Sequence, residues 1–205
     1  MWRDRTEAGQ ELSEALASYK NKKAVVYGLP RGGVVLAAEV ARALNAPLDI
    51  IAARKIGHPY NPEYAVGAVT ETGQLVANEA EVSDLPKNWL ESEVKRQTAE
   101  ALRRRKLYKN QHLSAEGKIA IVVDDGIATG LTLKAAIKQL KTEKPAKIVV
   151  AVPVAPDDTA AEIEAEVDQL IALRRETGWF GAVGNFYERF EEVTDDDVID
   201  ILAEF

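Results

Sequence analysis

Short apolar runs alternate with longer amphipathic segments along most of the chain. The runs at 24–27, 119–123 and 148–154 are continuously apolar, which is typical of parallel strands buried on both faces. The segments 34–45 and 131–143 each follow such a run and repeat apolar positions at helical spacing. This order of strand, loop and helix predicts an α/β protein with an open parallel sheet and flanking helices.

Other segments extend this prediction. A helix is expected from about Arg5 to Tyr19, and LDIIAAR at 48–54 is expected to form a second strand. Two short strands are expected within 65–77, with Gly73 in the turn between them. The heavily charged stretch 82–113 predicts one long exposed helix. We therefore expect a core over 1–175 that carries this helical insertion.

The tail at 176–205 differs in composition, because its aromatic residues crowd together in a chain that is only 6% aromatic. Thr194, which is followed by three Asp residues, is a good start for a last helix. We expect this tail to form a small aromatic hood over the carboxyl edge of the sheet. Packing of a small subdomain explains the same cluster equally well.

Composition narrows the functional classes. With 46% hydrophobic residues among 205, the chain has material for a core and is not expected to be disordered. The absence of Cys excludes disulfides and thiolate chemistry. The charged start predicts no secretory signal, and no apolar run is long enough for a bilayer, so we expect a cytoplasmic protein without membrane partners. A net charge of −7 argues against nucleic acid as a partner, so an anionic ligand needs a local site.

Two glycine-bearing loops follow predicted strands, where open α/β sheets bind ligands. In the string IVVDDGIATGLT, Asp124 and Asp125 end an apolar run and need hydrogen-bond donors or cations, which the hydroxyls of a ribose would provide. Gly126 and Gly130 free the backbone just before a helix begins, which favours binding of a monophosphate. Taken one at a time, the same residues are also common in ordinary turns that bind no ligand.

The whole string closely resembles the phosphoribosyl pyrophosphate (PRPP) binding motif of the type I phosphoribosyltransferases. A second segment, AVGNFYERF, is more weakly similar to an uncharacterised subgroup of phosphoribosyltransferase-like proteins. The first string is not a Walker loop, because Gly130 is followed by Leu131 and Thr132. A dinucleotide-binding fingerprint is disfavoured because the spacing of Gly28, Gly32 and Gly33 is not that of GxGxxG.

The resemblance implies transfer of the phosphoribosyl group of PRPP to a nitrogen acceptor, with release of pyrophosphate. It implies that Asp124 and Asp125 hold the ribose hydroxyls, directly or through Mg²⁺ that is bound mainly by PRPP. It also implies a cis peptide between Pro30 and Arg31. The 5′-phosphate would be bound by Gly126, Ile127, Ala128, Thr129, Gly130 and Thr132, and the pyrophosphate by Pro30, Arg31, Gly32, Gly33 and Lys55.

The acceptor is less defined. Family members that act on 6-oxopurines carry an Asp three residues beyond the second acid, where this chain has Ala128, so the loop looks more like the adenine and orotate type. For stacking of the acceptor base we expect Phe186 or Tyr187 first and Trp179 second. Asp124, Asp125, Arg31 and Lys55 are the expected catalytic residues.

Alternatives remain open at this stage. A PRPP-binding regulatory or RNA-binding protein without catalysis would retain the same loop, and so would a sugar-phosphate-binding domain that has lost activity. Arg103 to Lys106 is expected to be a solvated helix face, although it could reach an active site. Neither His58 nor His112 has a partner at metal-ligand spacing. The sequence leaves the oligomeric state open, a homodimer included.

Overall fold

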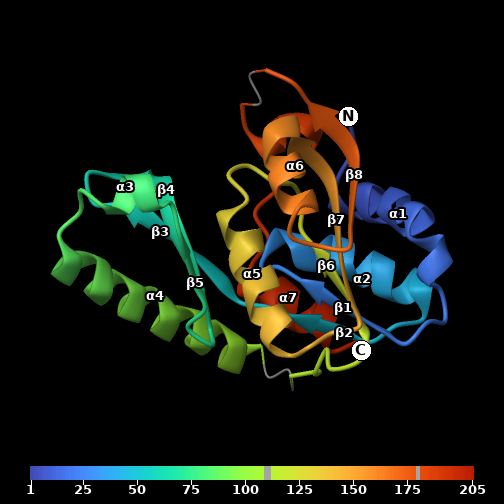
Figure 1. The fold of residues 1–205 in the computed structure, drawn as a ribbon. Helices are drawn as coiled ribbons and strands as arrows, with labels where there is room; N and C mark the ends of the chain where they lie inside the picture. Colours follow the sequence, from blue (N-terminus) through green and yellow to red (C-terminus); the bar gives the residue numbers. More distant parts are fainter. Residues whose placement is uncertain (109–111, 179–180) are drawn as a thin grey trace.

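The computed structural model describes residues 1–108, 112–178 and 181–205. Its main sheet has five strands in the order β2-β1-β6-β7-β8, and every neighbouring pair is parallel. Helices cover both of its faces (Figure 1), which confirms the predicted α/β class. The elements of this core are α1 (Arg5–Ala15), β1 (Ala24–Gly28), α2 (Gly32–Leu44), β2 (Leu48–Ile50), β6 (Ile119–Val123), α5 (Leu131–Thr142), β7 (Lys147–Pro156), α6 (Asp157–Glu164), β8 (Gln169–Glu176) and α7 (Asp195–Leu202).

Alternate residues of each central strand face opposite layers. In β1, Val26 packs into a cluster with residues of α1 and α2, whereas Val25 packs into a cluster with residues of α5 and α6. Both side chains are fully buried. The continuously apolar runs in the sequence therefore have the predicted cause, which is burial of each strand on both faces.

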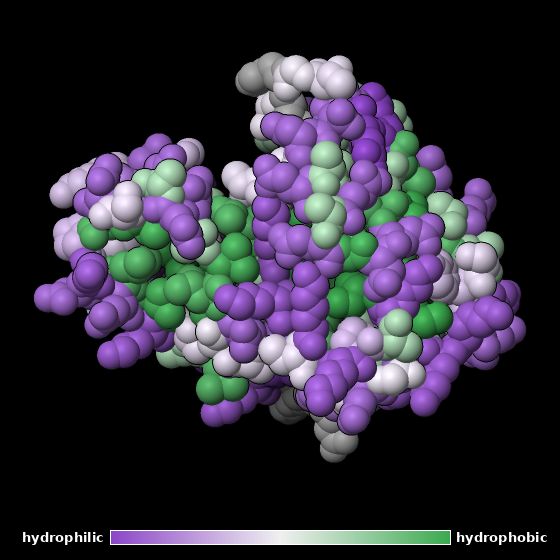
Figure 2. Space-filling view, viewed as in Figure 1, coloured by the Kyte–Doolittle hydropathy of each residue, from purple (hydrophilic) through white to green (hydrophobic). Residues whose placement is uncertain are grey.

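A second, antiparallel sheet projects from the core and forms an arm. It comprises β3 (Ala53–His58), β4 (Asn61–Thr70) and β5 (Leu75–Ala77), followed by α3 (Glu79–Val82) and α4 (Lys87–Leu107). Figure 1 shows this arm extending away from the main sheet, with α4 along its outer edge. Figure 2 shows apolar residues on the arm, while α4 is mostly hydrophilic on the visible face. The apolar cluster of the arm packs its strands against α3 and α4. The expected turn at Gly73, with φ of +81°, is confirmed.

The prediction of one strand over 48–54 is wrong. The main sheet keeps only Leu48–Ile50, and the chain then turns so that Ala53 begins β3 of the arm. A hydrogen bond from the Ala53 N–H to the Ile51 carbonyl, 3.0 Å long, closes this turn. The sequence carries no sign of the change, because Ile51 and Ala52 are as buried as the strand before them. Arg54 and Lys55 consequently belong to the arm.

The expectation of a solvated face at Arg103 to Lys106 is wrong for Arg105, which is 8% exposed. Its guanidinium lies 2.8 Å from Asp49 of β2, a carboxylate with no exposed surface. His112 lies 3.3 Å from the same carboxylate. The ion pair between Arg105 and Asp49 connects the end of α4 to the core. Although α4 has 21 residues, none of the helices in the described ranges is both long and apolar enough to cross a membrane.

The C-terminal segment crosses the molecule and meets the N-terminus. Trp2 and Tyr187 form a parallel bridge, in which the Trp2 N–H donates to the Phe186 carbonyl at 2.9 Å. The last helix, α7, begins with the predicted Thr194 cap, which forms a capping box with Asp197. Val198 of α7 packs with Val34 of α2, so this helix covers the core beside β2.

Removal of the Arg105 side chain tests the junction between arm and core. We expect Arg105→Ala to lower the free energy of unfolding by about 3 to 5 kcal/mol, because it leaves the buried Asp49 carboxylate without its guanidinium. Urea denaturation followed by circular dichroism measures this loss. The matched control is Arg103→Ala on the exposed face of the same helix, which should cost less than about 1 kcal/mol. Equal losses in the two variants would contradict the structural role of Arg105.

Candidate active site

The turn after β6 forms the predicted loop and helix start. Gly126 and Gly130 have φ of +155° and +70°, and Gly130 is the N-cap of α5. Within the described residues, the N–H groups of Ala128 and Thr129 make no hydrogen bond, and both residues are exposed. Free amides at the positive end of a helix are arranged to bind an anion. We call residues 126–132 the phosphate loop.

A cavity of about 170 Å³ opens beside the phosphate loop. Asp124 lines it from the end of β6, Lys55 lines it from the arm, and Val183 lines it from the C-terminal segment. A Cβ atom at Gly126 would lie 2.6 Å from Val183, so glycine permits this close packing. The core, the arm and the tail therefore meet at one site, although they are far apart in the sequence.

The two acids of this turn, Asp124 and Asp125, form what we call the acid pair. Burial, and then the negative charge of Asp125, raises the pKa of Asp124. Burial also raises the pKa of Asp125, and the adjacent Arg5 opposes that rise. One oxygen of Asp124 accepts the Asp125 N–H at 2.9 Å, and its other oxygen makes no hydrogen bond among the described residues. Each acid of the pair therefore has one oxygen with no hydrogen bond among the described residues, and Asp124 is the one that lines the cavity.

The N-terminus of α2 lies directly against the acid pair. A Cβ atom at Gly32 would lie 2.0 Å from Oδ2 of Asp125, and one at Gly33 would lie 2.8 Å from Oδ1 of Asp124. A side chain at either position would collide with one of the acids, so glycine is needed there whether or not a ligand approaches the loop. The peptide between Pro30 and Arg31 is cis, as predicted.

The expected pyrophosphate cation, Arg31, is paired with acids of the C-terminal segment. Its guanidinium contacts Glu192, and it lies 3.9 Å from Asp195. The side chain of Glu192 is 77% exposed, so this pairing costs little to break. A pyrophosphate at the first loop would compete with Glu192 for Arg31.

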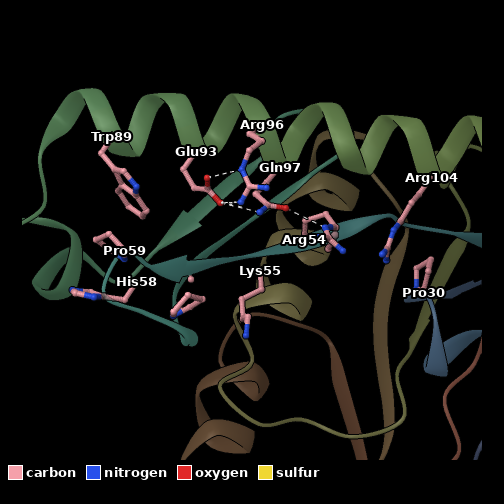
Figure 3. A pocket seen from close by; sticks show the side chains of 13 residues that line it. Pro30, Arg54, Lys55, His58, Pro59, Trp89, Glu93, Arg96, Gln97 and Arg104 are labelled. Carbon is pink, nitrogen blue, oxygen red and sulfur yellow. Dashed lines mark hydrogen bonds and ion pairs between the residues drawn. The ribbon is translucent and has the colours of Figure 1, made fainter.

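A larger cavity of about 400 Å³ lies between β3 and α4 and is rich in cations. Figure 3 shows Arg54 and Arg104 near Pro30 at one end, and Trp89 at the other. Burial, followed by the positive charge of Arg104, lowers the pKa of Arg54. Among the described residues Arg54 makes no ion pair, and it donates to Gln97 at 3.1 Å. A half-buried guanidinium among other cations favours an anionic ligand.

Sequence reasoning gave little weight to Arg54 and Arg104. Arg54 stood at an expected strand end, and Arg104 stood in a basic run that was expected to be solvated. No pattern in the sequence could place them together, because one lies on β3 and the other near the end of α4. Lys55, which the sequence did single out, lines both cavities.

The aromatic tail lies close to the site, but Tyr187 is packed against other rings and does not offer the surface for a base that we expected. Tyr187 is 5% exposed, with its ring between Trp2 and Phe190, and its hydroxyl donates to the Asp125 carbonyl at 2.6 Å. Its place is that of a packing residue, with no open face for a base. Phe186 is half-buried beneath Arg174, and stacking there stays a prediction. Trp179 lies outside the described residues.

A parallel α/β sheet whose strand ends carry an acid pair beside a helix N-terminus belongs to the class of open α/β proteins that can bind an anionic ligand at this edge. The family model of the phosphoribosyl transferase domain matches residues 5–189. The chain belongs to this family.

One relative carries the name of this family, and two solved structures are similar to the chain. A candidate phosphoribosyl transferase of Mycobacterium tuberculosis is 40% identical over 203 residues, which are 97% of this chain and 46% of the relative. The chain thus spans less than half of that relative. The crystal structure of TT1426 from Thermus thermophilus has a TM-score of 0.82 and 42% identity, and the match covers 99% of this chain and 98% of that one. The AQ2163 protein of Aquifex aeolicus shares the fold, with a TM-score of 0.53, 12% identity and coverage of 84% and 75%.

Removal of the Glu192 charge tests the competition for Arg31. We expect Glu192→Gln to tighten the binding of inorganic pyrophosphate about two- to fivefold, the scale of an exposed ion pair, because it releases the guanidinium. Isothermal titration calorimetry measures this affinity. Glu191→Gln removes the same charge one residue away, where the structure shows no side-chain contact to Arg31, and serves as the control. Equal tightening in both variants would mean that only the overall charge matters.

Proposed function

We propose that this protein transfers the phosphoribosyl group of PRPP to a nitrogen acceptor and releases pyrophosphate. The observation that carries the proposal is the convergence of Asp124, the open amides of the phosphate loop and the N-terminus of α5 on one cavity. This arrangement suits a ribose 5-phosphate, whose phosphate takes the amides and whose hydroxyls donate to the carboxylate. Membership of the family supports the same reaction.

The pyrophosphate of PRPP would occupy the cation-rich side of the site. Lys55 lines both cavities, and Arg54 and Arg104 lie beside Pro30 of the first loop. As the bond from the anomeric carbon to the leaving oxygen breaks, negative charge grows on pyrophosphate and positive charge grows on the ribose ring. Cations and amides on one side, with the Asp124 carboxylate on the other, stabilise this separation of charge.

The residues present fit a role for Mg²⁺. Asp124 lines the cavity and has a carboxylate oxygen with no hydrogen bond among the described residues, and Mg²⁺ commonly takes one or two carboxylates together with phosphate oxygens and water. No group of three or more His, Asp or Glu side chains in the described part of the chain could hold a metal alone, so PRPP would supply the other ligands. When bound with PRPP, the ion neutralises charge on the departing pyrophosphate.

For the acceptor we propose a planar nitrogen base of the adenine or orotate type. Ala128 stands in the phosphate loop where members acting on 6-oxopurines carry an Asp, which disfavours hypoxanthine and guanine. The acceptor would lie between the phosphate loop and the segment 183–186, where Val183 already lines the cavity. Phe186 is the described aromatic residue that we propose for stacking.

The test is a reaction screen. The purified chain, incubated with PRPP, Mg²⁺ and a panel of purine and pyrimidine bases, should release pyrophosphate and form a nucleotide with one acceptor class. Asp124→Asn should weaken PRPP binding by about 1 to 3 kcal/mol, because a charged hydrogen-bond acceptor is lost. The control is Asp84→Asn, at an exposed carboxylate of the arm.

Three results separate the candidate functions. Pyrophosphate release that depends on the acceptor supports the transferase. PRPP binding without release by any acceptor would favour a regulatory PRPP-binding protein. Loss of PRPP affinity in Asp84→Asn as large as in Asp124→Asn would remove Asp124 from the ribose site.

A further inference from the structure

The cavity between β3 and α4 extends beyond the end at which we place the pyrophosphate of PRPP. Pro30 of the first loop lies at one end and Trp89 of α4 at the other, with Arg54 and Lys55 between them (Figure 3). Its volume of about 400 Å³ is within the usual range of small-molecule sites. A pyrophosphate beside Pro30 is too small to fill this space, so the arm has room for a ligand of its own.

Positive charge in this cavity exceeds the charge of its own acids. Four basic side chains line it, which are Arg54, Lys55, Arg96 and Arg104, whereas Glu93 is the one carboxylate in its described lining. The Glu93 oxygens are already engaged, because they accept from Arg96 at 2.6 and 2.8 Å and from Nε2 of Gln97 at 2.8 Å. The remaining cations favour a ligand with several negative charges.

Arg54 is held in place while its outer N–H groups stay free. Gln97, which is 6% exposed, accepts the Nε–H of Arg54 at 3.1 Å and is itself fixed by its bond to Glu93. The two Nη groups of Arg54 make no hydrogen bond within the described ranges. A guanidinium that is fixed through Nε can therefore offer both Nη groups to a phosphate.

The far end of the cavity is aromatic and apolar. The Trp89 side chain is half-buried, because it packs against the apolar cluster of the arm and also lines the cavity. Pro59 lies below the indole in Figure 3, with His58 beside it. An indole that lines a cavity beside a proline ring suits a planar base, because any nucleobase can stack on an aromatic face.

We propose that this cavity is a second binding site, which takes a nucleoside polyphosphate with its phosphates among the arginines and its base against Trp89. The order of cations and indole along the cavity matches the order of phosphates and base in such a ligand. The described lining contains no residue of the phosphate loop or the acid pair, so this site differs from the one proposed for ribose 5-phosphate. Lys55 lines both cavities, so a nucleotide that contacts it excludes the pyrophosphate of PRPP. This exclusion rests on the proposed function, whereas nucleotide binding itself does not.

The first experiment measures affinity by calorimetry without Mg²⁺, with ATP and GTP as probes and inorganic tripolyphosphate as the ligand that lacks a base. Trp89→Leu should weaken binding of the nucleotide about fivefold or more, because stacking is lost. It should leave tripolyphosphate affinity within about twofold, since the arginines are untouched. Failure of both nucleotides to bind the wild-type chain, or equal losses for nucleotide and tripolyphosphate in the variant, would overturn the proposal.

Tryptophan fluorescence tests the contact with the base directly. Nucleotide binding should quench the emission of the wild-type chain, because the base stacks on the Trp89 indole. In Trp89→Phe the nucleotide should still bind, since an aromatic ring remains, but the quenching should disappear. Quenching that persists in this variant would come from another tryptophan and would show that the proposed stacking is wrong. This readout also decides the matter if Trp89→Leu does not fold.

Arg96→Gln tests the phosphate end of the site. This change should weaken nucleotide and tripolyphosphate binding alike, by about three- to fivefold, the scale of an exposed ion pair. The matched control is Arg103→Gln, because Arg103 pairs with Glu100 as Arg96 pairs with Glu93, three residues earlier on the same helix, but does not line the cavity. The control should lose less than about twofold. Equal losses would mean that only the overall charge of α4 matters.

Asp124→Asn separates this site from the phosphate loop. It should leave nucleotide affinity within about twofold, since Asp124 lines the other cavity. A nucleotide that loses affinity in Asp124→Asn but keeps it in Trp89→Leu occupies the transferase site, and the proposal is then wrong.

The exclusion at Lys55 is tested with both ligands together. Saturating nucleotide should weaken PRPP binding to the wild-type chain about tenfold or more, by mass action. Unchanged PRPP affinity would overturn the exclusion. A chain that binds nucleotide but no PRPP would support the second site and count against the proposed function alone.

Discussion

Two adjacent carboxylates at the end of a buried strand are the constraint on which the site depends. Removing both from water is costly unless cations and hydrogen-bond donors surround them. The N-terminus of α2 meets them, and this contact requires that Gly32 and Gly33 have no side chains. Arg5 compensates the second carboxylate, and the C-terminal segment holds Arg5 through Glu191 and Phe190. Segments from both ends of the chain are thus organised around the turn after β6.

The side of the site that the arm forms is rich in positive charge, although the whole chain carries a net charge of −7. Its cations come from the arm, which is a separate sheet, whereas the acids and the phosphate loop come from the core. Arg54 and Arg104 line the cavity between β3 and α4, whereas the acid pair follows the end of β6. Arg105 near the end of α4 and Asp49 of β2 form a buried ion pair that joins the arm to the core.

Much of the core could be predicted from the sequence, because local signals there agree with the fold. The apolar runs marked β1, β6 and β7, glycines and acids marked the loop at 124–132, and Thr194 marked the start of α7. The switch from β2 to β3 left no local signal, since burial continues through Ile51. The burial of Arg105 and the role of Arg5 were hidden for another reason, because their partners Asp49 and Asp125 lie far away in the sequence.

The central claim is that Asp124 and the phosphate loop together bind the ribose 5-phosphate part of PRPP. A crystal structure of the wild-type chain with PRPP and Mg²⁺ tests it most directly. The account predicts the 5′-phosphate on the amides that follow Gly126, the ribose hydroxyls against Asp124, and the pyrophosphate between the first loop and Lys55. A 5′-phosphate bound in the cavity between β3 and α4, with no ligand at the phosphate loop, would contradict it.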